Sequence, residues 1–161
     1  MIKSLTHILD KVFRGCLASL MLVMLVSVSW QVISRYLLDS PSSWTEELAR
    51  FSLIWIAMLG AAYAYHVKMH LGLDLLVLKL THQGSIKLKL LLHALTILFA
   101  SVVMIYGGLQ FVLMTHELKQ YSAALGWPMY LVYLCLPLSG VMLVIYAILD
   151  WQLLASEDHH D

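Results

Sequence analysis

Four long apolar segments take up most of this 161-residue chain and fix the kind of fold that it can adopt. The first runs from Gly15 to Ser34 without a charged residue, and about 20 apolar helical residues cross the roughly 30 Å hydrocarbon layer of a bilayer. It continues beyond the core of about 15 residues of a cleaved signal peptide, which favours a permanent span. We expect spanning helices at about 15–36, 46–65, 90–115 and 128–150.

The composition agrees with a membrane protein. Hydrophobic residues make up 61% of the chain and charged residues 12%, against about 25% charged residues in soluble domains. The formal net charge of zero excludes the basic footprint of a nucleic-acid-binding protein, so the lipid bilayer is the expected surroundings. Because no linker or separate soluble segment interrupts the chain, we predict an all-α membrane protein with one four-helix transmembrane domain over residues 1–161.

Local signals refine these helices. The stretch Ser43–Glu46 has the capping-box pattern of a helix start, and Pro128 suits the first turn of a helix. Pro137 lies inside the fourth segment, where we expect a kink. The segment 70–80 is too short to span and too apolar for a free loop, which predicts a short interfacial helix between the second and third spans.

Basic residues are distributed unevenly over the two sides of this predicted bundle. Seven lie before the first span or between the second and third, and three lie on the opposite side. Because Lys and Arg in short loops mark the cytoplasmic side, both termini are predicted to be cytoplasmic. The seven are Lys3, Lys11, Arg14, Lys68, Lys79, Lys87 and Lys89, and the three are Arg35, Arg50 and Lys119.

Polar and amphipathic side chains gather where the first two spans should meet at the outer membrane surface. Glu46 and Glu47 precede Arg50 by four and three positions, the favourable order for an ion pair on a helix. The second carboxylate then needs another cation, and Arg35 is the nearest candidate within the chain. Ionisable groups near hydrocarbon are costly, so the cluster predicts a specific contact. Its members are Gln31, Arg35, Trp44, Glu46, Glu47 and Arg50.

Two interpretations of this charge cluster remain open. An ion pair on a solvated helix contributes only a few tenths of a kcal/mol, so the charges can simply cover a wet helix end. In a desolvated contact with a partner chain, removal of one member would cost on the order of 3 to 5 kcal/mol.

Small residues recur in the expected spans and permit close helix contact, either within the bundle or with a partner chain. The glycines concerned are Gly60 in the second span, Gly107 and Gly108 in the third, and Gly140 in the fourth. No carboxylate lies within the apolar cores, which argues against a proton-coupled exporter.

Motifs of enzyme active sites are missing from the sequence: there is no HExxH, no Gly-rich phosphate loop and no nucleophile paired with a base. We therefore predict a chain that is not an enzyme and binds no cofactor of its own. Two of His66, His70 and His93 could ligate a haem iron, although interfacial imidazoles are the favoured interpretation. A haem-binding membrane anchor of a respiratory enzyme is the alternative function.

The order Arg35-Tyr36, Trp44-x-Glu46-Glu47-x-x-Arg50, Trp55, Gly60-Ala61-Ala62 and His70 resembles the small membrane subunit of tripartite ATP-independent periplasmic (TRAP) transporters, the DctQ-like family. The resemblance covers nearly the whole chain in length and helix count, and the motif itself lies between residues 35 and 74. His66 departs from the Arg of the family pattern, which puts a basic role at that position in doubt.

The resemblance implies a multi-pass protein of the bacterial inner membrane that works with a large TRAP membrane subunit and a periplasmic substrate-binding protein. In this family the large subunit carries the substrate and sodium sites and moves as an elevator, while the small subunit enlarges the static scaffold. The implied substrates are organic acids, with sialic acid suggested by overall likeness.

Overall fold

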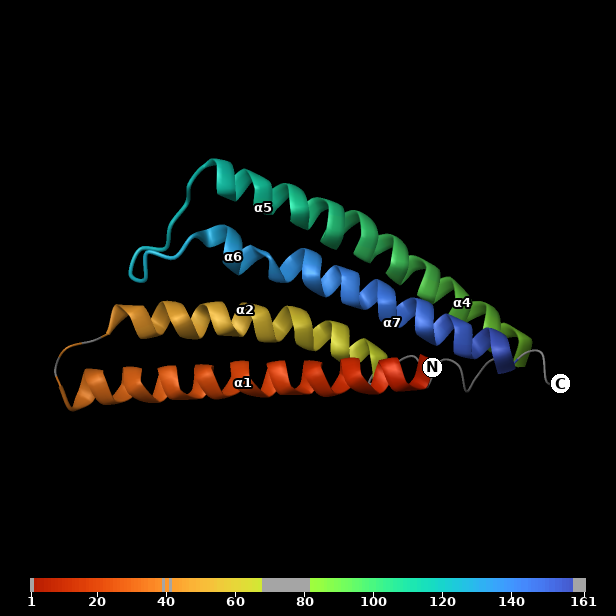
Figure 1. Ribbon diagram of the computed structural model, residues 1–161, viewed down its shortest axis with the longest axis horizontal. Coiled ribbons are helices and arrows are strands. Elements are labelled where there is room, and N and C mark those ends of the chain that lie inside the picture. Colours follow the sequence, from red (N-terminus) through yellow and green to blue (C-terminus); the bar gives the residue numbers. More distant parts are fainter. Residues whose placement is uncertain (1, 39, 41, 68–81, 158–161) are drawn as a thin grey trace. The chain divides into compact units, whose positions relative to one another are not determined.

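The computed structural model describes residues 2–38, 40, 42–67 and 82–157 of the chain. Four stretches of this part are long and apolar enough to cross a membrane, which confirms the predicted all-α class and the four spans (Figure 1). The sidedness of the termini stays a prediction, and the interfacial helix predicted at 70–80 lies outside the described residues. The four stretches are Asp10–Tyr36, Ser43–His66, Leu88–Glu117 and Met129–Leu149.

Seven helical elements make up these spans within the described residues. They are α1 (Ile2–Tyr36), α2 (Ser43–His66), α4 (His82–Phe99), η1 (Ala100–Gly107), α5 (Gly108–Glu117), α6 (Met129–Tyr133) and α7 (Cys135–Glu157). Contacts divide the chain into two compact units, residues 1–60 with 112–135 and residues 61–111 with 136–161. Organisation as a single domain stays a prediction.

Helix α2 begins at Ser43, one residue earlier than the capping-box pattern predicted, in which Ser43 itself would be the N-cap. Ser42 stands at the N-cap, and its Oγ lies 2.5 Å from Thr45 Oγ1 in the first turn. Thr45 Oγ1 also donates to the carbonyl oxygen of Ser42 at 2.8 Å, and its side chain is fully buried. The start of α2 is therefore fixed by two hydroxyl groups next to the charge cluster.

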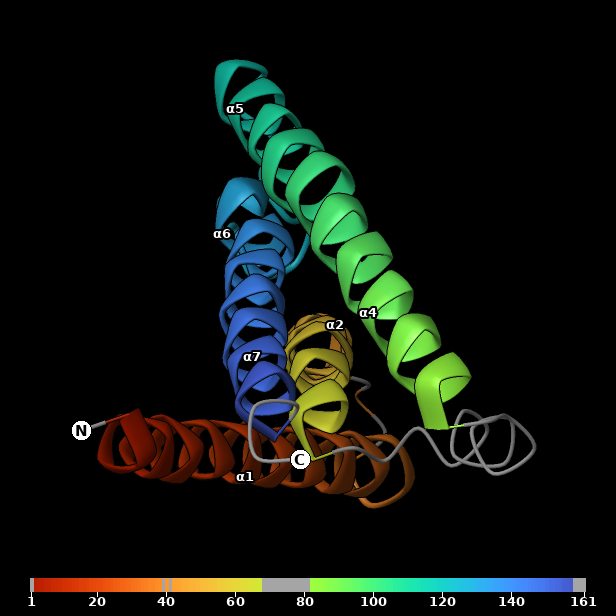
Figure 2. The ribbon, with the colours of Figure 1, turned by 90° about the vertical axis from the view of Figure 1, so that its right-hand side faces the viewer.

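The third span contains a feature that the sequence did not predict, the π-helix η1 between α4 and α5. Figure 2 shows α4, η1 and α5 as one continuous helical rod. A Cβ atom built on Gly140 of α7 would lie 2.7 Å from Met104 Cβ and 3.0 Å from Ile105 Cγ1, both in η1. Helix α7 thus approaches η1 at a glycine, in the close packing that small residues permit.

The irregularity expected near Pro137 takes the form of an interruption of the fourth span. Helix α6 ends at Tyr133 and α7 begins at Cys135, with Leu134 between them. Pro137 has no N–H group to bond the carbonyl of Tyr133 four residues earlier, and its ring crowds that carbonyl. The break consequently falls one turn before the proline, which itself lies in the first turn of α7.

Candidate functional site at the start of α2

Arg50 pairs with Glu46 along the surface of α2. Arg50 Nη2 lies 2.8 Å from Glu46 Oε1, and the two side chains are 63% and 57% exposed. This is one of the two pairs, i, i+4 and i, i+3, that the sequence spacing allowed. Both side chains are exposed in the isolated chain, and an exposed pair of this spacing in water contributes only a few tenths of a kcal/mol to the stability of a helix.

Glu47 contacts a different part of the chain, the segment that joins α5 to α6. Its Oε1 accepts hydrogen bonds from the backbone N–H groups of Ala123 and Ala124 at 3.0 and 3.1 Å. Its Oε2 accepts a third from the N–H of Leu125 at 2.9 Å. Three consecutive backbone amides thus converge on one carboxylate, in the manner of an anion-binding backbone nest. Hydrogen bonds to an ionised acceptor are stronger than those between neutral groups.

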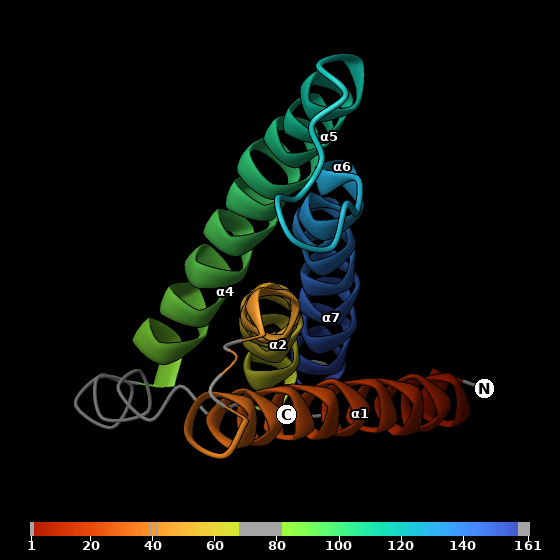
Figure 3. The same ribbon diagram turned by 90° about the vertical axis from the view of Figure 1, so that its left-hand side faces the viewer.

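The segment 118–128 that supplies these amides is an ordered turn, hereafter the α5–α6 loop. Figure 3 shows this loop as the thin trace between α5 and α6. Within the loop, Tyr121 and Pro128 form an isolated antiparallel bridge. Ser122 N donates to the carbonyl of Trp127 at 2.8 Å, and Trp127 N donates to Ser122 Oγ at 3.1 Å. Gly126 adopts a φ of 66°, a left-handed conformation that favours glycine.

Arg35 does not provide the counter-charge that the sequence suggested for Glu47. Its guanidinium carbon lies 5.8 Å from the ring centroid of Tyr36, within cation–π range, and its side chain is exposed. The three loop amides occupy the Glu47 carboxylate instead. The predicted pairing of Glu47 with Arg35 is therefore wrong, because backbone donors that are distant in sequence take the place of a side-chain cation.

Hydroxyl groups connect the end of α1 with the start of α2 beside this cluster. Ser34 Oγ donates to the carbonyl of Gln31 at 3.0 Å and lies 3.2 Å from Ser42 Oγ. Ser34 is buried, as is Ser27, whose Oγ donates to the carbonyl of Val23. Ser27, Ser34 and the half-buried side chain of Gln31 therefore form a polar stripe of α1 that faces inward.

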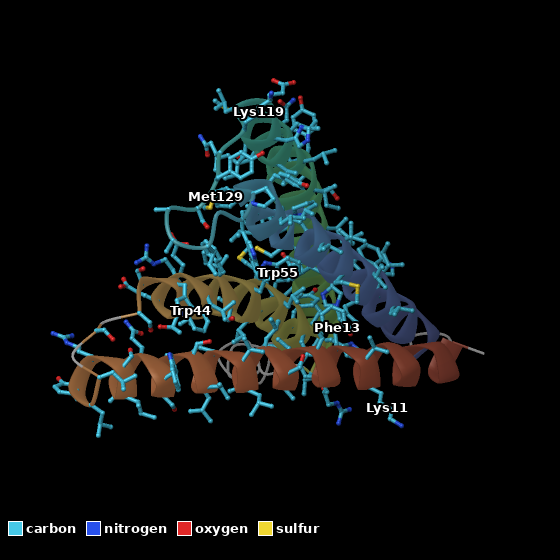
Figure 4. The ribbon with its side chains drawn as sticks, turned by 60° about the vertical axis from the view of Figure 1, so that its left-hand side comes forward. Lys11, Phe13, Trp44, Trp55, Lys119 and Met129 are labelled. Carbon is cyan, nitrogen blue, oxygen red and sulfur yellow. The ribbon has the colours of Figure 1, made fainter. Side chains whose placement is uncertain are left out.

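The aromatic member of the cluster, Trp44, is 46% exposed at the start of α2 (Figure 4). Tyr121 and Trp127 of the α5–α6 loop are likewise exposed. Their exposure suits aromatic rings at the surface of a membrane, where Trp and Tyr are enriched.

Gly60, the last predicted member of the site, is not in close contact with the described residues. A Cβ atom built there would meet no heavy atom within 4 Å. Of the two alternatives for the small residues, close packing within the chain is therefore found at Gly140 and Gly108 and not at Gly60, where contact with a partner chain stays a prediction. At Gly108 the built Cβ would lie 3.1 Å from both Leu136 Cβ and Pro137 Cδ.

His66 and His93, two of the candidate haem ligands, each lie next to a tyrosine ring. The ring of His66 stacks on that of Tyr146 with centroids 4.2 Å apart and planes at 15°. The His93 ring lies 5.9 Å from Tyr65, tilted by 56°. These contacts fit packed interior rings, and His70 lies outside the described residues.

Residues 24–156 match the family of the DctQ component of tripartite ATP-independent periplasmic transporters. With its four apolar helices the chain is a multi-pass protein of the bacterial inner membrane. It belongs to the DctQ family, whose members are permease components and not enzymes.

Three relatives illustrate the similarity. A Haemophilus influenzae protein assigned as a TRAP transporter small permease is 29% identical over 88% of this chain and 86% of its own length. The sialic acid TRAP transporter small permease protein SiaQ of Vibrio cholerae is 27% identical, over 66% of this chain and 61% of its own length. The isethionate TRAP transporter permease protein DctMQ of Oleidesulfovibrio alaskensis is 28% identical over 77% of this chain and 20% of its own length.

Proposed function

We propose that this chain is the small scaffold subunit of a sodium-coupled TRAP transporter that imports an organic acid. In this proposal a periplasmic binding protein delivers the substrate, and the chain supports a large elevator-type membrane subunit. The observation that carries the proposal is the family match over residues 24–156, which takes in all four spans except the start of the first.

The partnership with a large subunit is supported by the DctMQ relative. Its name joins two components, and the part similar to this chain makes up only 20% of it. The positions of the carboxylates also support a static role. The carboxylates of the described spans, Asp10, Glu46, Glu47 and Glu117, lie near the ends of those spans. None lies midway along a span, where a coupling ion would need a ligand.

The proposed substrate class follows from what the relatives are named for. Sialic acid is a carboxylate and isethionate a sulfonate, so both names describe small organic anions. We propose an organic acid as the substrate of the complete transporter, with sialic acid as the more specific suggestion. The residues that select it would lie in the partner chains.

Sidedness is the first testable consequence. Reporters active on only one side of the membrane should give a cytoplasmic signal after Asp161 and a periplasmic signal when inserted at Leu118. The reason is the excess of basic residues before the first span and between the second and third. The reverse pattern would show that the start of α2 and the α5–α6 loop face the cytoplasm.

Assembly and transport test the proposal itself. Co-expressed with a large TRAP membrane subunit of the same organism, the chain should co-purify in a fixed ratio. Proteoliposomes holding both chains should take up the organic acid when the binding protein and an inward sodium gradient are supplied. Collapse of the gradient with a sodium ionophore is the control and should abolish uptake. Equal uptake by proteoliposomes that contain this chain alone would refute the scaffold role.

A further inference from the structure

The Glu47 carboxylate joins two segments that lie far apart in sequence. Its hydrogen bonds reach across 76 to 78 residues, from the first turns of α2 to the α5–α6 loop. Glu46, the adjacent carboxylate, points instead to Arg50 on its own helix. Two neighbouring residues of one chemical type therefore make contacts of different kinds, one between segments and one within a helix.

Within the described loop, the hydrogen bonds that are formed internally do not involve the three N–H groups that donate to Glu47. The internal hydrogen bonds of the loop come from the N–H groups of Ser122, Gly126 and Trp127, on either side of the stretch 123–125. Helical or sheet partners do not reach this stretch in the described structure, because it is a turn. Glu47 thus supplies the acceptors for the tip of the loop.

We propose that Glu47 is a positioning residue: its carboxylate holds the tip of the α5–α6 loop in one conformation and so pre-forms the surface that the loop presents. The exposed rings of Tyr121 and Trp127 belong to that surface. The charge of Glu47 acts within the chain, whereas an ion-pair site for a partner would need a carboxylate open to a cation. This inference goes beyond the proposed scaffold role, and only its transport consequence rests on that role.

The effect of losing the carboxylate is expected to be local. The Ala123 and Ala124 sites are exposed, so water can replace the acceptor there, while the Leu125 amide is partly buried. In Glu47→Gln one carboxylate oxygen becomes an N–H₂ group, which cannot accept from a backbone amide. One of the three hydrogen bonds must therefore be lost, and the other two lose their ionised acceptor.

Amide hydrogen exchange of the detergent-solubilised chain tests this directly. In Glu47→Gln the exchange of residues 123–125 should accelerate by about tenfold or more, the change expected for losing a hydrogen bond to a charged acceptor. Trypsin cleavage after Lys119, at the start of the loop, should accelerate in parallel. The matched control Glu46→Gln removes the neighbouring carboxylate and should leave both rates unchanged. Equal rates in the two variants would overturn the proposal.

Two further measurements distinguish a role of Glu47 in positioning the loop from a role in the stability of the whole chain. The melting temperature of Glu47→Gln should stay close to that of the unsubstituted chain, and faster exchange in all helices would overturn the local role. In the complete transporter Glu47→Gln should lower uptake several-fold at normal co-purification. Undiminished uptake by Glu47→Gln would show that transport does not use the positioned loop. Failure of the unsubstituted complex to assemble or transport would refute the proposed function and leave the exchange result standing.

Discussion

Leucine in place of Gly140 is expected to lower the melting temperature of the detergent-solubilised chain by about 5 °C or more. A Cβ atom at this position would lie 2.7 Å from Met104 Cβ and 3.0 Å from Ile105 Cγ1, closer than real Cβ contacts allow. Neither neighbour is the free end of a flexible side chain, and the carbonyl oxygen of Ala100 lies 3.3 Å away. Helix α7 must therefore move away from η1, and the packing between them is lost.

Gly60→Leu is the matched control, because the same side chain enters a spanning helix at a glycine with no heavy atom within 4 Å of its built Cβ. The isolated chain should keep its melting temperature. If Gly140→Leu were as stable as Gly60→Leu, α7 and η1 would not pack as the structure shows. A stable Gly60→Leu chain that fails to co-purify with the large subunit would place Gly60 at the interface between the subunits.

The spanning helices could be predicted from the sequence because length and apolarity are sufficient to define them. The π-helix η1 could not, since its residues 100–107 form an apolar run, and apolarity does not distinguish a π-helix from an α-helix. Its close contact with α7 depends on Gly140, the one glycine of that helix. The sequence offered Gly60, Gly107, Gly108 and Gly140 as equals, and only the three-dimensional packing distinguishes the open position from the tight ones.

Only part of the charge cluster could be predicted from the sequence, because contacts between distant segments depend on the three-dimensional fold. Helical spacing predicted that one of the two carboxylates pairs with Arg50, and in the structure this is Glu46. The environment of Glu47 does not follow from spacing, because its partners are backbone amides that every residue except proline carries and that no side-chain pattern reveals. The sequence did hold one hint, since Gly126 and Pro128 mark a turn in the segment that supplies those amides.

Alanine in place of Tyr146 should destabilise the chain by about 3 kcal/mol or more, a larger loss than leucine at Gly140 should cause. Tyr146 is fully buried and stacks on His66 at 4.2 Å, so its truncation leaves a cavity and removes the stacking partner of the imidazole. Thermal unfolding in detergent should show a loss of about 10 °C.

The control for this substitution is Tyr146→Phe, which keeps the ring and its stacking on His66 and removes only the hydroxyl group. It should retain most of the stability that Tyr146→Ala loses, because the filled volume and the ring contact are preserved. An equal loss in both variants would assign the stability to the hydroxyl group instead of the stacked ring. A small loss in both would mean that the end of α2 and α7 do not pack through these two rings, and that the contact observed between His66 and Tyr146 contributes little to the bundle.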